Sequence, residues 1–328
     1  MSRKDDHILL ALKQKRNFNN GLDAIKLPYH ALKTVDYNNV DISSCFLDCK
    51  INAPILINAM SGGSCLAYEI NKKLAQLANY FKIPMVTGSM NILLKDKSYI
   101  DSFKVIREYN PDGIVIMNIN ANTSIEEVAL LKKIIAVDAI EIHLNPIQEL
   151  MMAEGDRCFE NRLFNIKNIA DLDNVIIKDV GFGMSYETAN LLYDLGIKYI
   201  DISGKGGTDF AWIEQQRHNN MPDLIFNDFG YSTYQSLMNV QKIKDDIIII
   251  ASGGINNSVD IVKSLVLGAK IVGMSYYFLD LVWNKSLEEA IFEFEKLLVD
   301  FKKIMSLLGV RTIEELASVS YEQSKLQI

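Results

Sequence analysis

The sequence is poor in cysteine, in histidine and in positive charge. Its 328 residues include four cysteines and four histidines, with no C-x-x-C pair and no spacing typical of a zinc site. We therefore expect free thiols, as in a reducing cytoplasm, and no disulfide framework. The 34 lysines and arginines are outnumbered by 41 aspartates and glutamates, which gives a net charge of −7. This sign argues against a nucleic-acid partner but allows a local basic pocket.

Long apolar runs are also absent. The charged segment Met1–Leu10 lacks the apolar core of a secretory signal, and no run approaches the ~20 residues that a membrane helix needs. We therefore expect no membrane association and a cytoplasmic location. With 49% hydrophobic and 23% charged residues, the composition is typical of a folded globular protein.

What the sequence does contain is a regular alternation of short apolar runs and longer amphipathic segments. This alternation predicts parallel strands that are buried on both faces and joined by helices. The predicted strands are Ile55–Asn58, Pro84–Thr87, Ile114–Asn118, Ala139–His143, Val175–Lys178, Tyr199–Ser203, Ile247–Ser252 and Lys270–Gly273. Eight such units predict an α/β fold, the (β/α)₈ TIM barrel. A doubly wound open sheet is the alternative, because strand counts from one sequence err by one or two.

The remaining segments complete a single barrel domain over residues 1–328. Residues 1–50 are interpreted as an N-terminal extension, and the period of Leu287–Leu308 predicts a closing C-terminal helix. The connection Asp209–Phe229 contains Trp212 and Arg217 and is long for a barrel loop. We expect it to be a lid over the site.

Most of the glycines follow predicted strands, at the end of the barrel where active sites lie. Glycine there lets backbone N–H groups approach a ligand. The loops after strands seven and eight, which contain Gly253-Gly254 and Gly273-Met274-Ser275, commonly bind phosphate. The pattern predicts a phosphorylated ligand, and it does not separate FMN from a sugar phosphate.

Polar side chains follow strands four and five. His143, Asn145, Gln148 and Glu149 cluster after the fourth strand, where a substrate would lie. A single carboxylate such as Glu149 suits Mg²⁺, which fills its other positions with water and phosphate; a solvated helix acid is the equal alternative. Lys178 ends an apolar strand, so it is expected to face an anionic ring or phosphate, or else an acid partner.

The N-terminal cluster Arg3-Lys4-Asp5-Asp6-His7 has two interpretations. It is either a frayed, solvated end or a basic clamp that closes over an anionic substrate. Charge alone leaves both open, although a net-acidic protein must concentrate positive charge somewhere to hold a diphosphate.

Seven motifs then follow one another in order from Arg3 to about Leu279. They are Arg3-Lys-Asp-Asp-His-Ile8, Ala59-Met-Ser-Gly-Gly63, His143-x-Asn-x-x-Gln-Glu149, Glu154-Gly-Asp-Arg157, Lys178-x-x-Gly-x-Gly183, Asp201-x-Ser-Gly-x-Gly-Gly-Thr208 and Ser252-Gly-Gly254. Each alone is weak, but together they resemble the type 2 isopentenyl-diphosphate isomerases. These are FMN-dependent (β/α)₈ enzymes that interconvert isopentenyl and dimethylallyl diphosphate.

The resemblance implies roles for the matching positions. Flavin contacts are implied for Ala59, Met60, Ser61, Ser89, Asn118, Ser203 and Thr208, with Lys178 beside the N1/C2 edge of the ring. FMN phosphate contacts are implied for Gly253, Gly254, Met274 and Ser275. Substrate contacts are implied for Arg3, Lys4, His143, Asn145 and Gln148, and a Mg²⁺ ligand for Glu149. Lys178 and Gln148 would be the catalytic residues.

The resemblance also implies cofactors and partners. FMN would act in its reduced form, supplied by NADPH, with Mg²⁺ on the small-molecule diphosphate substrate in isoprenoid biosynthesis. Relatives of this fold suggest a homo-oligomer, a tetramer or larger. The chemistry moves a double bond without net redox change, so the reduced flavin is expected to be the main acid–base group.

One segment departs from the family pattern. Where the family often reads Gly-Ser-Gln-Arg, this chain reads Gly88-Ser89-Met90-Asn91, so a cation expected near the diphosphate is missing. Lys95 is one candidate to compensate.

Two other functions compete with the isomerase. FMN-dependent 2-hydroxy-acid oxidases share the barrel, but they resemble Ser-Asn-His-Gly-Gly-Arg after the sixth strand, where this chain has Ser203-Gly-Lys-Gly-Gly-Thr208. Their His base and Arg are absent, which argues against that oxidation. A flavin-binding protein without activity is supported only by the altered segment near Met90.

Overall fold

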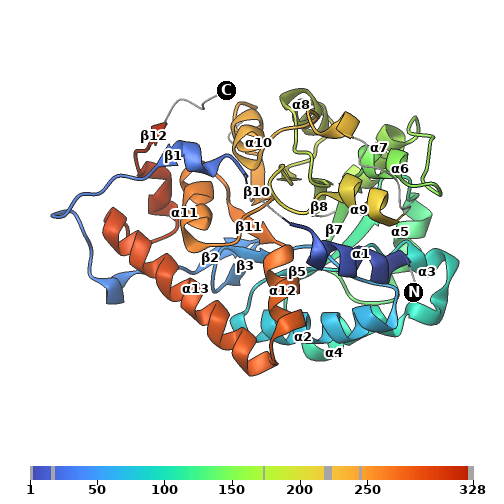
Figure 1. Ribbon diagram of the computed structural model, residues 1–328, viewed down its shortest axis with the longest axis horizontal. Coiled ribbons are helices and arrows are strands. Elements are labelled where there is room, and N and C mark those ends of the chain that lie inside the picture. Colours follow the sequence, from blue (N-terminus) through green and yellow to red (C-terminus); the bar gives the residue numbers. More distant parts are fainter. Residues whose placement is uncertain (1–2, 16–18, 173, 218–223, 244–245, 324–328) are drawn as a thin grey trace.

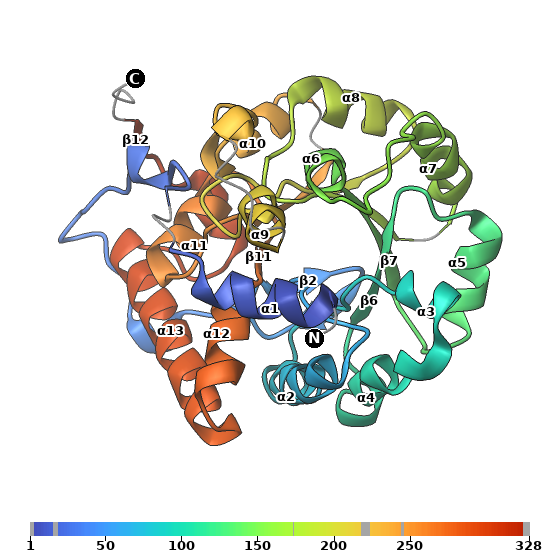
Figure 2. The ribbon, with the colours of Figure 1, turned by 45° about the vertical axis from the view of Figure 1, so that its right-hand side comes forward.

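The computed structural model describes residues 3–15, 19–172, 174–217, 224–243 and 246–323. Within these residues, eight parallel strands close into a barrel (Figures 1 and 2). The strands are β4 (Ile55–Ile57), β5 (Met85–Val86), β6 (Val115–Asn120), β7 (Ala139–Leu144), β8 (Val175–Asp179), β9 (Tyr199–Asp201), β10 (Ile248–Ser252) and β11 (Ile271–Met274). The predicted (β/α)₈ fold is confirmed, and every predicted strand overlaps an observed one.

Helices connect the strands and form an outer ring (Figure 2). They are α2 (Cys65–Phe81), α4 (Asp101–Tyr109), α5 (Ile125–Lys132), α7 (Arg162–Ala170), α8 (Tyr186–Asp194), α10 (Thr233–Val240), α11 (Ser258–Val266), α12 (Tyr276–Asn284) and α13 (Leu287–Leu308). Capping boxes start α5, α10 and α13: the side chains of Ser124, Ser232 and Ser286 each accept from the third residue of the helix. The matching Glu or Gln at that position bonds back, which fixes where each helix begins.

A short hairpin closes the amino end of the barrel. β2 (Ser44–Phe46) pairs with β3 (Cys49–Ile51) in antiparallel register, and both turn residues, Leu47 and Asp48, are left-handed. Two left-handed residues are typical of a type I′ hairpin turn. Phe46 and Leu47 pack in one apolar cluster with inward-facing barrel residues such as Leu56. The extension predicted over residues 1–50 therefore contains strands that the sequence analysis missed.

The other small elements lie at the ends of the chain and between barrel units. β1 (Ile25–Lys26) pairs with β12 (Glu322–Gln323) in antiparallel register. The 3₁₀ turns are η1 (Leu22–Ala24), η2 (Tyr37–Asn39), η3 (Lys97–Tyr99), η4 (Leu224–Phe226) and η5 (Glu314–Ser318).

Three helices lie at the carboxyl end of the barrel. α1 (Arg3–Lys13) packs against α9 (Phe210–Arg217), and α9 packs against α6 (Pro146–Met151). Figure 2 shows α1 and α9 in front of the barrel. The short α3 (Ile92–Lys95) follows β5. The cluster that begins at Arg3 therefore lies on a packed helix, not on a solvated segment.

The segment Asp209–Phe229 was predicted to be a lid, and α9 occupies its first part. Residues 218–223 of that segment lie outside the described residues. The helix buries Ala211, Ile213 and Glu214 against its neighbours, so this part has a defined packed position. Closure of the lid on a ligand stays a prediction.

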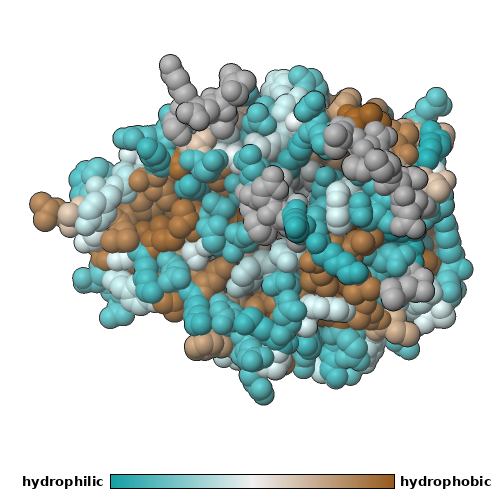
Figure 3. All heavy atoms as spheres, viewed as in Figure 1, coloured by the Kyte–Doolittle hydropathy of each residue, from teal (hydrophilic) through white to brown (hydrophobic). Residues whose placement is uncertain are grey.

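The outer surface includes apolar areas. On the face in Figure 3, hydrophobic residues gather over the region of α11 and α13, helices whose Val259 and Leu307 are substantially exposed. Assembly into a homo-oligomer stays a prediction. Among the described helices, none is both long and apolar enough to cross a membrane.

Candidate active site

A cavity of about 760 Å³ opens at the carboxyl ends of the strands. Barrel loops, α1 and the start of α12 all contribute to its wall. The sequence-predicted residues that line it are Arg3, Lys4, Ala59, Met60, Ser61, Ser89, Asn118, His143, Asn145, Gln148, Glu149, Lys178, Ser203, Thr208, Gly253, Gly254 and Ser275. Met274 does not line it: its side chain is 1% exposed and packs in the core, and its carbonyl accepts from the Asn58 backbone.

Lys178 lies on the floor of this cavity. Its Nζ is 3.1 Å from Asp201 Oδ2 and 3.4 Å from Ser252 Oγ. The Asn58 amide donates to the same Asp201 oxygen over 2.7 Å, and Ser252 Oγ donates to the other. Of the two alternatives left open for Lys178, an acid partner is therefore present, while the side chain also faces the cavity. This pairing resolves the cost of burying its charge.

A second buried acid, Glu141, lies on the neighbouring strand β7. Its Oε1 accepts from Asn118 Nδ2 over 2.6 Å, and its Oε2 has no hydrogen-bond partner among the described residues. Burial raises the pKa of Glu141 to about 7, with Lys178 and the Asn118 hydrogen bond opposing the shift and Asp201 adding to it. Glu141 was not predicted as a site residue because it lies within an apolar strand whose pattern does not show which face points inward.

Asn118 fixes the state of His143. Because the Asn118 amide nitrogen donates to Glu141, its Oδ1 faces His143 Nδ1 at 2.8 Å and accepts the proton there. Burial lowers the pKa of His143 to about 3, and the charges of Lys4 and Arg162 add to the effect. His143 is therefore neutral at pH 7, with Nε2 unprotonated and able to accept a hydrogen bond.

Glycine loops after β9 and β10 form the opposite wall. Gly253 and Gly254 have φ values of 110° and 71°. A Cβ on Gly253 would lie 2.1 Å from the Gly204 carbonyl oxygen, and one on Gly207 would lie 2.7 Å from the Gly254 nitrogen. Side chains are therefore excluded where these two loops meet, and the backbone of both lines the cavity.

The helices that follow β10 and β11 differ at their N-termini. At α11, the Asn257 side chain accepts from Asp260 N, so this end is capped. At α12, Ser275 makes no capping hydrogen bond, and both Ser275 and Tyr276 line the cavity. The positive end of α12, which has no side-chain cap from Ser275, therefore lies at the cavity wall, an arrangement that suits a phosphate.

One face of α1 lines the cavity, and its residues follow a regular helical period. Lys4, His7, Ile8 and Ala11 all line the cavity, and their spacing places them on one side of a helix. Burial lowers the pKa of Lys4 to about 8, and the nearby Arg3 lowers it further while acids oppose the shift. The period was visible in the sequence and could have predicted this helix.

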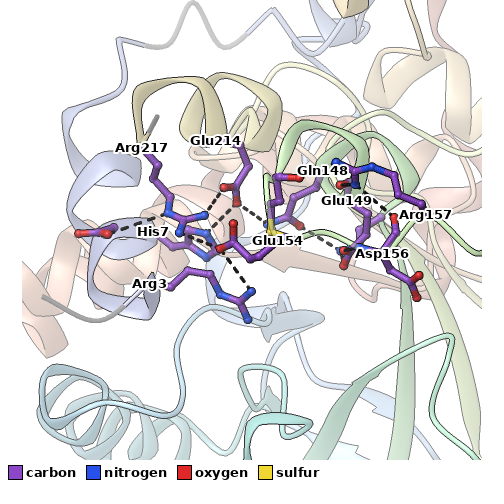
Figure 4. Close-up of polar contacts among 12 residues, drawn as sticks. Arg3, His7, Gln148, Glu149, Glu154, Asp156, Arg157, Glu214 and Arg217 are labelled. Carbon is purple, nitrogen blue, oxygen red and sulfur yellow. Dashed lines mark hydrogen bonds and ion pairs between the residues drawn. The ribbon is translucent and has the colours of Figure 1, made fainter. Parts of the chain in front are cut away.

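α1 is joined to α9 and α6 by a polar cluster centred on Glu214 (Figure 4). His7 Nε2 lies 2.8 Å from Glu214 Oε1, the Gln148 amide donates to the same oxygen over 3.2 Å, and Arg217 pairs with Oε2. Burial acts to raise the pKa of Glu214, but these partners outweigh it and hold the pKa low. Glu214, fully buried, had not been singled out.

Glu149, on α6, is held by the residue that precedes this helix and by the segment that follows it. Its Oε1 accepts from Asn145 Nδ2 over 2.9 Å and its Oε2 from the Asp156 backbone over 2.8 Å (Figure 4). No group of three or more His, Cys, Asp or Glu side chains converges among the described residues. A metal here would be held by one carboxylate, with water and ligand oxygens completing the set, as is usual for Mg²⁺.

In the altered segment after β5, the side chains of Met90 and Asn91 are both held by contacts within the protein. Met90 is fully buried. The Asn91 amide donates to Thr123 Oγ1 over 2.7 Å, while its oxygen accepts from Asn120 N over 2.8 Å and from Ser89 over 3.2 Å. Asn91 lines the cavity as a neutral residue that bridges two loops. Lys95 lies on the exposed rim.

The stretch after β9 lacks the groups of a hydroxy-acid oxidase. Residues 203–208 supply glycine backbone, the Ser203 and Thr208 hydroxyls and Lys205, whose Nζ bonds the Asn227 carbonyl. Neither a histidine nor an arginine occurs in these six residues. The His base and the Arg of those oxidases are therefore absent at that position.

Comparison with known proteins places the chain among flavin-dependent proteins. A family model of FMN-dependent dehydrogenases matches residues 142–323. An isopentenyl-diphosphate delta-isomerase of Bacillus licheniformis is 40% identical over 317 residues, covering 96% of this chain and 90% of that protein. One of Staphylococcus epidermidis is 37% identical over 316 residues, with the same shares covered.

Solved structures of low identity share the fold. A lactate oxidase of Pediococcus acidilactici aligns with a TM-score of 0.72 at 17% identity, covering 96% of this chain and 87% of that one. A flavocytochrome b2 variant with pyruvate bound aligns with a TM-score of 0.71 at 19% identity, covering 98% and 83%. At these identities the comparison shows a shared fold, the barrel, and nothing about function.

Proposed function

This chain belongs to the FMN-dependent isopentenyl-diphosphate delta-isomerases, and on that premise we propose that it interconverts isopentenyl and dimethylallyl diphosphate with reduced FMN and Mg²⁺, in isoprenoid biosynthesis. The observation that carries the proposal is the convergence of a basic helix, a single held carboxylate and a buried lysine on one cavity. These groups are what a diphosphate, a divalent metal and an anionic ring require.

The fit to FMN rests on two features of the cavity wall. The Gly207 and Gly254 backbones approach where no Cβ fits, and the uncapped start of α12 offers N–H groups beside them. Gly253, Gly254 and Ser275 would hold the FMN phosphate there. The strand-end residues Ala59, Met60, Ser61, Ser89, Asn118, Ser203 and Thr208 would line the ring and its chain. Bound reduced FMN would supply protonatable nitrogens, N5 above all, for the proton transfers.

Lys178 would provide electrostatic stabilisation on the cavity floor. Asp201 and Ser252 hold its Nζ in one place, so the charge needs no reorganisation during the reaction. A fixed cation in a site from which water is excluded favours an anionic group facing it far more than it would in water.

The diphosphate would lie on the side of the cavity away from Lys178, beneath α1. Arg3 and Lys4 on α1 supply positive charge, and Glu149 would share a Mg²⁺ ion with phosphate oxygens. His143 Nε2 and the Asn145 amide add neutral hydrogen-bonding groups. α1 covers this side with Ile8 and Ala11, which would keep water from the reacting carbons.

Gln148 would act next to the reacting carbons, with its orientation fixed from both ends. Its amide nitrogen donates to Glu214 and its oxygen accepts from Asn145 over 3.2 Å. Because Glu214 is itself held by His7 and Arg217, a small turn of Gln148 would break several contacts. Glu214 and His7 are positioning residues in this account.

NADPH as the reductant and the cytoplasmic location are part of the same proposal. The test is to purify the protein, read its absorbance for bound flavin, reduce it anaerobically with NADPH and add isopentenyl diphosphate with Mg²⁺. We expect yellow protein that forms dimethylallyl diphosphate only after reduction. Colourless protein that takes up no FMN at saturation, or reduced holoprotein that leaves the substrate unchanged, would overturn the proposal. Flavin reduction by lactate or glycolate would favour an oxidase instead.

A further inference from the structure

Arg162, the first residue of α7, is a cavity-wall cation that the sequence analysis did not single out. Its side chain is half-buried and lines the cavity with Lys4, His143 and Glu149. Its buried Nε has no hydrogen-bond partner in the part of the chain that the structure describes. A buried guanidinium nitrogen without a partner leaves the charge of Arg162 incompletely compensated, so an anionic ligand in the cavity would stabilise this side chain.

The other arginines around the cavity are already engaged. Arg217 pairs with Glu214 and with Glu154, the latter over 2.9 Å. Arg157 donates to the Met152 carbonyl over 2.7 Å and to the Glu149 carbonyl. Arg3 lies 3.7 Å from Glu154 Oε1. Arg162 differs from these because it contacts an aromatic ring, and no carboxylate or carbonyl among the described residues accepts a hydrogen bond from it.

That ring holds the guanidinium in place. The Arg162 Cζ lies 4.3 Å from the centroid of the Phe159 ring, a cation–π contact that restricts the guanidinium without using its N–H groups as hydrogen-bond donors. A pre-oriented guanidinium loses less entropy when it binds a phosphate than a mobile lysine does.

The charge of Arg162 interacts with the other titratable groups of the cavity wall. Burial lowers the pKa of Arg162, and Glu149 and Asp156 oppose that shift. Its charge is also among the causes that lower the pKa of His143. Arg162 therefore acts on the same space as the carboxylate that would hold Mg²⁺ and the histidine that would contact substrate.

A cation that the family resemblance predicts is missing from another part of the cavity wall. The resemblance leads one to expect an arginine at position 91, but Asn91 is neutral and its side chain bridges Thr123 and Asn120. Lys95 is a poor substitute because it is exposed on the rim, where solvent and salt screen its charge.

We propose that Arg162 binds the diphosphate group of the substrate and supplies the cation that is missing at position 91. The inference rests on the proposed function. The guanidinium would donate two parallel N–H groups to phosphate oxygens, which is the geometry that makes arginine selective for phosphate. Arg3 and Lys4 on α1 would contact the same group from another side.

The test measures diphosphate binding and turnover on the FMN-loaded protein. Inorganic pyrophosphate is titrated in Mg²⁺ by calorimetry into wild type, Arg162→Met, Arg162→Lys and the matched control Lys95→Met. We expect Arg162→Met to weaken binding about 10- to 100-fold, Arg162→Lys to recover part of the loss, and Lys95→Met to change it less than about threefold. KM for isopentenyl diphosphate should rise with Kd while kcat stays within about threefold.

The other outcomes would overturn either the role of Arg162 or the proposed function. Arg162→Met that binds pyrophosphate like wild type, or Lys95→Met with the larger loss, overturns the assignment while an active wild type preserves the proposed function. Wild type that neither binds pyrophosphate nor isomerises overturns the proposed function itself. FMN content and thermal melting check each variant, and Arg162→Gln replaces Arg162→Met should the latter not fold.

Discussion

The interior of the barrel has two ends of opposite character, and β8 shows the change within three residues. Ile176 and Lys178 both point into the barrel because side chains alternate along a strand. Ile176 packs with Phe46 and Ile250 in the apolar cluster at the amino end. Lys178 pairs with Asp201 at the cavity floor.

The same change occurs on five other strands. Inward positions run from apolar to polar toward the carboxyl end: Leu56 to Asn58, Ile116 to Asn118, Ala139 to Glu141, Tyr199 to Asp201, and Ile250 to Ser252. The amino end is filled by side chains and by the β2–β3 hairpin, while the carboxyl end keeps a cavity. One end of the interior therefore contributes stability and the other contributes chemistry, as is usual for this fold.

The largest effect should come from removing the cation at the cavity end. Lys178→Met keeps the aliphatic stem and deletes the charge. We expect kcat to fall about 10²- to 10⁴-fold, since a fixed charge facing a developing anion is worth that much in a buried site. Steady-state kinetics of the reduced holoenzyme measures it, and full activity in the variant would remove this role.

That substitution also leaves Asp201 as a buried carboxylate without its ion pair, which is destabilising. Lys178→Met/Asp201→Asn is the matched control, because the amide oxygen can still accept from Asn58 while the amide nitrogen donates to Ser252 Oγ, which no longer accepts from Lys178. We expect the double variant to melt closer to wild type than the single variant and to remain inactive. Recovery of activity in the double variant would mean that stability, not the charge, had been limiting.

The opposite substitution tests the amino end. Leu56 is fully buried in the apolar cluster, so Leu56→Ala should cost about 2–5 kcal/mol of unfolding free energy from lost transfer and a residual cavity. Denaturant titration measures the loss, and FMN affinity and kcat should stay within about twofold. A specific loss of FMN binding would show that the two ends are coupled rather than separate.

The sequence predicted this architecture well because the strands are continuous apolar runs. β4 to β11 all overlap predicted segments, and α13 has the predicted bounds, Leu287–Leu308. The polar rim was also predictable, since glycines and polar residues directly follow strands. The predicted binding residues meet at one cavity, apart from Met274.

What the sequence did not predict depends on contacts between distant segments. Glu141 was hidden because an apolar strand does not reveal which face is inward. Glu214 and Arg162 lie on helices whose orientation toward the cavity follows from packing, not from a local motif. Phe46 belongs to a hairpin of three-residue strands, too short for a periodic signal.

The third test concerns the metal at the cavity end. Glu149→Gln should weaken the response of turnover to Mg²⁺, with the half-activating concentration rising about 10- to 100-fold because the single charged ligand is lost. Glu127→Gln is the matched control: Glu127 also lines the cavity, and glutamine preserves its capping box with Ser124. A Mg²⁺ response in Glu149→Gln that equals the control would argue against Glu149 as the ligand.

The smallest effect should come from Glu141, the acid nearest the boundary between the two ends. Its pKa is raised from 4.5 to about 7 by burial. Between these values the folded protein binds a proton that the unfolded chain has released, so this group makes stability fall as pH rises from about 5 to 7. Glu141→Gln removes the titration while its amide oxygen still accepts from Asn118.

We therefore expect Glu141→Gln to melt like wild type near pH 5 and to be more stable near pH 8, by on the order of 1 kcal/mol. Thermal melts at both pH values measure the difference. Asp179, whose pKa burial also raises to about 7, is present in both proteins, so its contribution cancels in the comparison. A constant offset between variant and wild type at all pH values would mean that Glu141 does not change charge in this range, and that the polar end of the barrel holds a permanent carboxylate there.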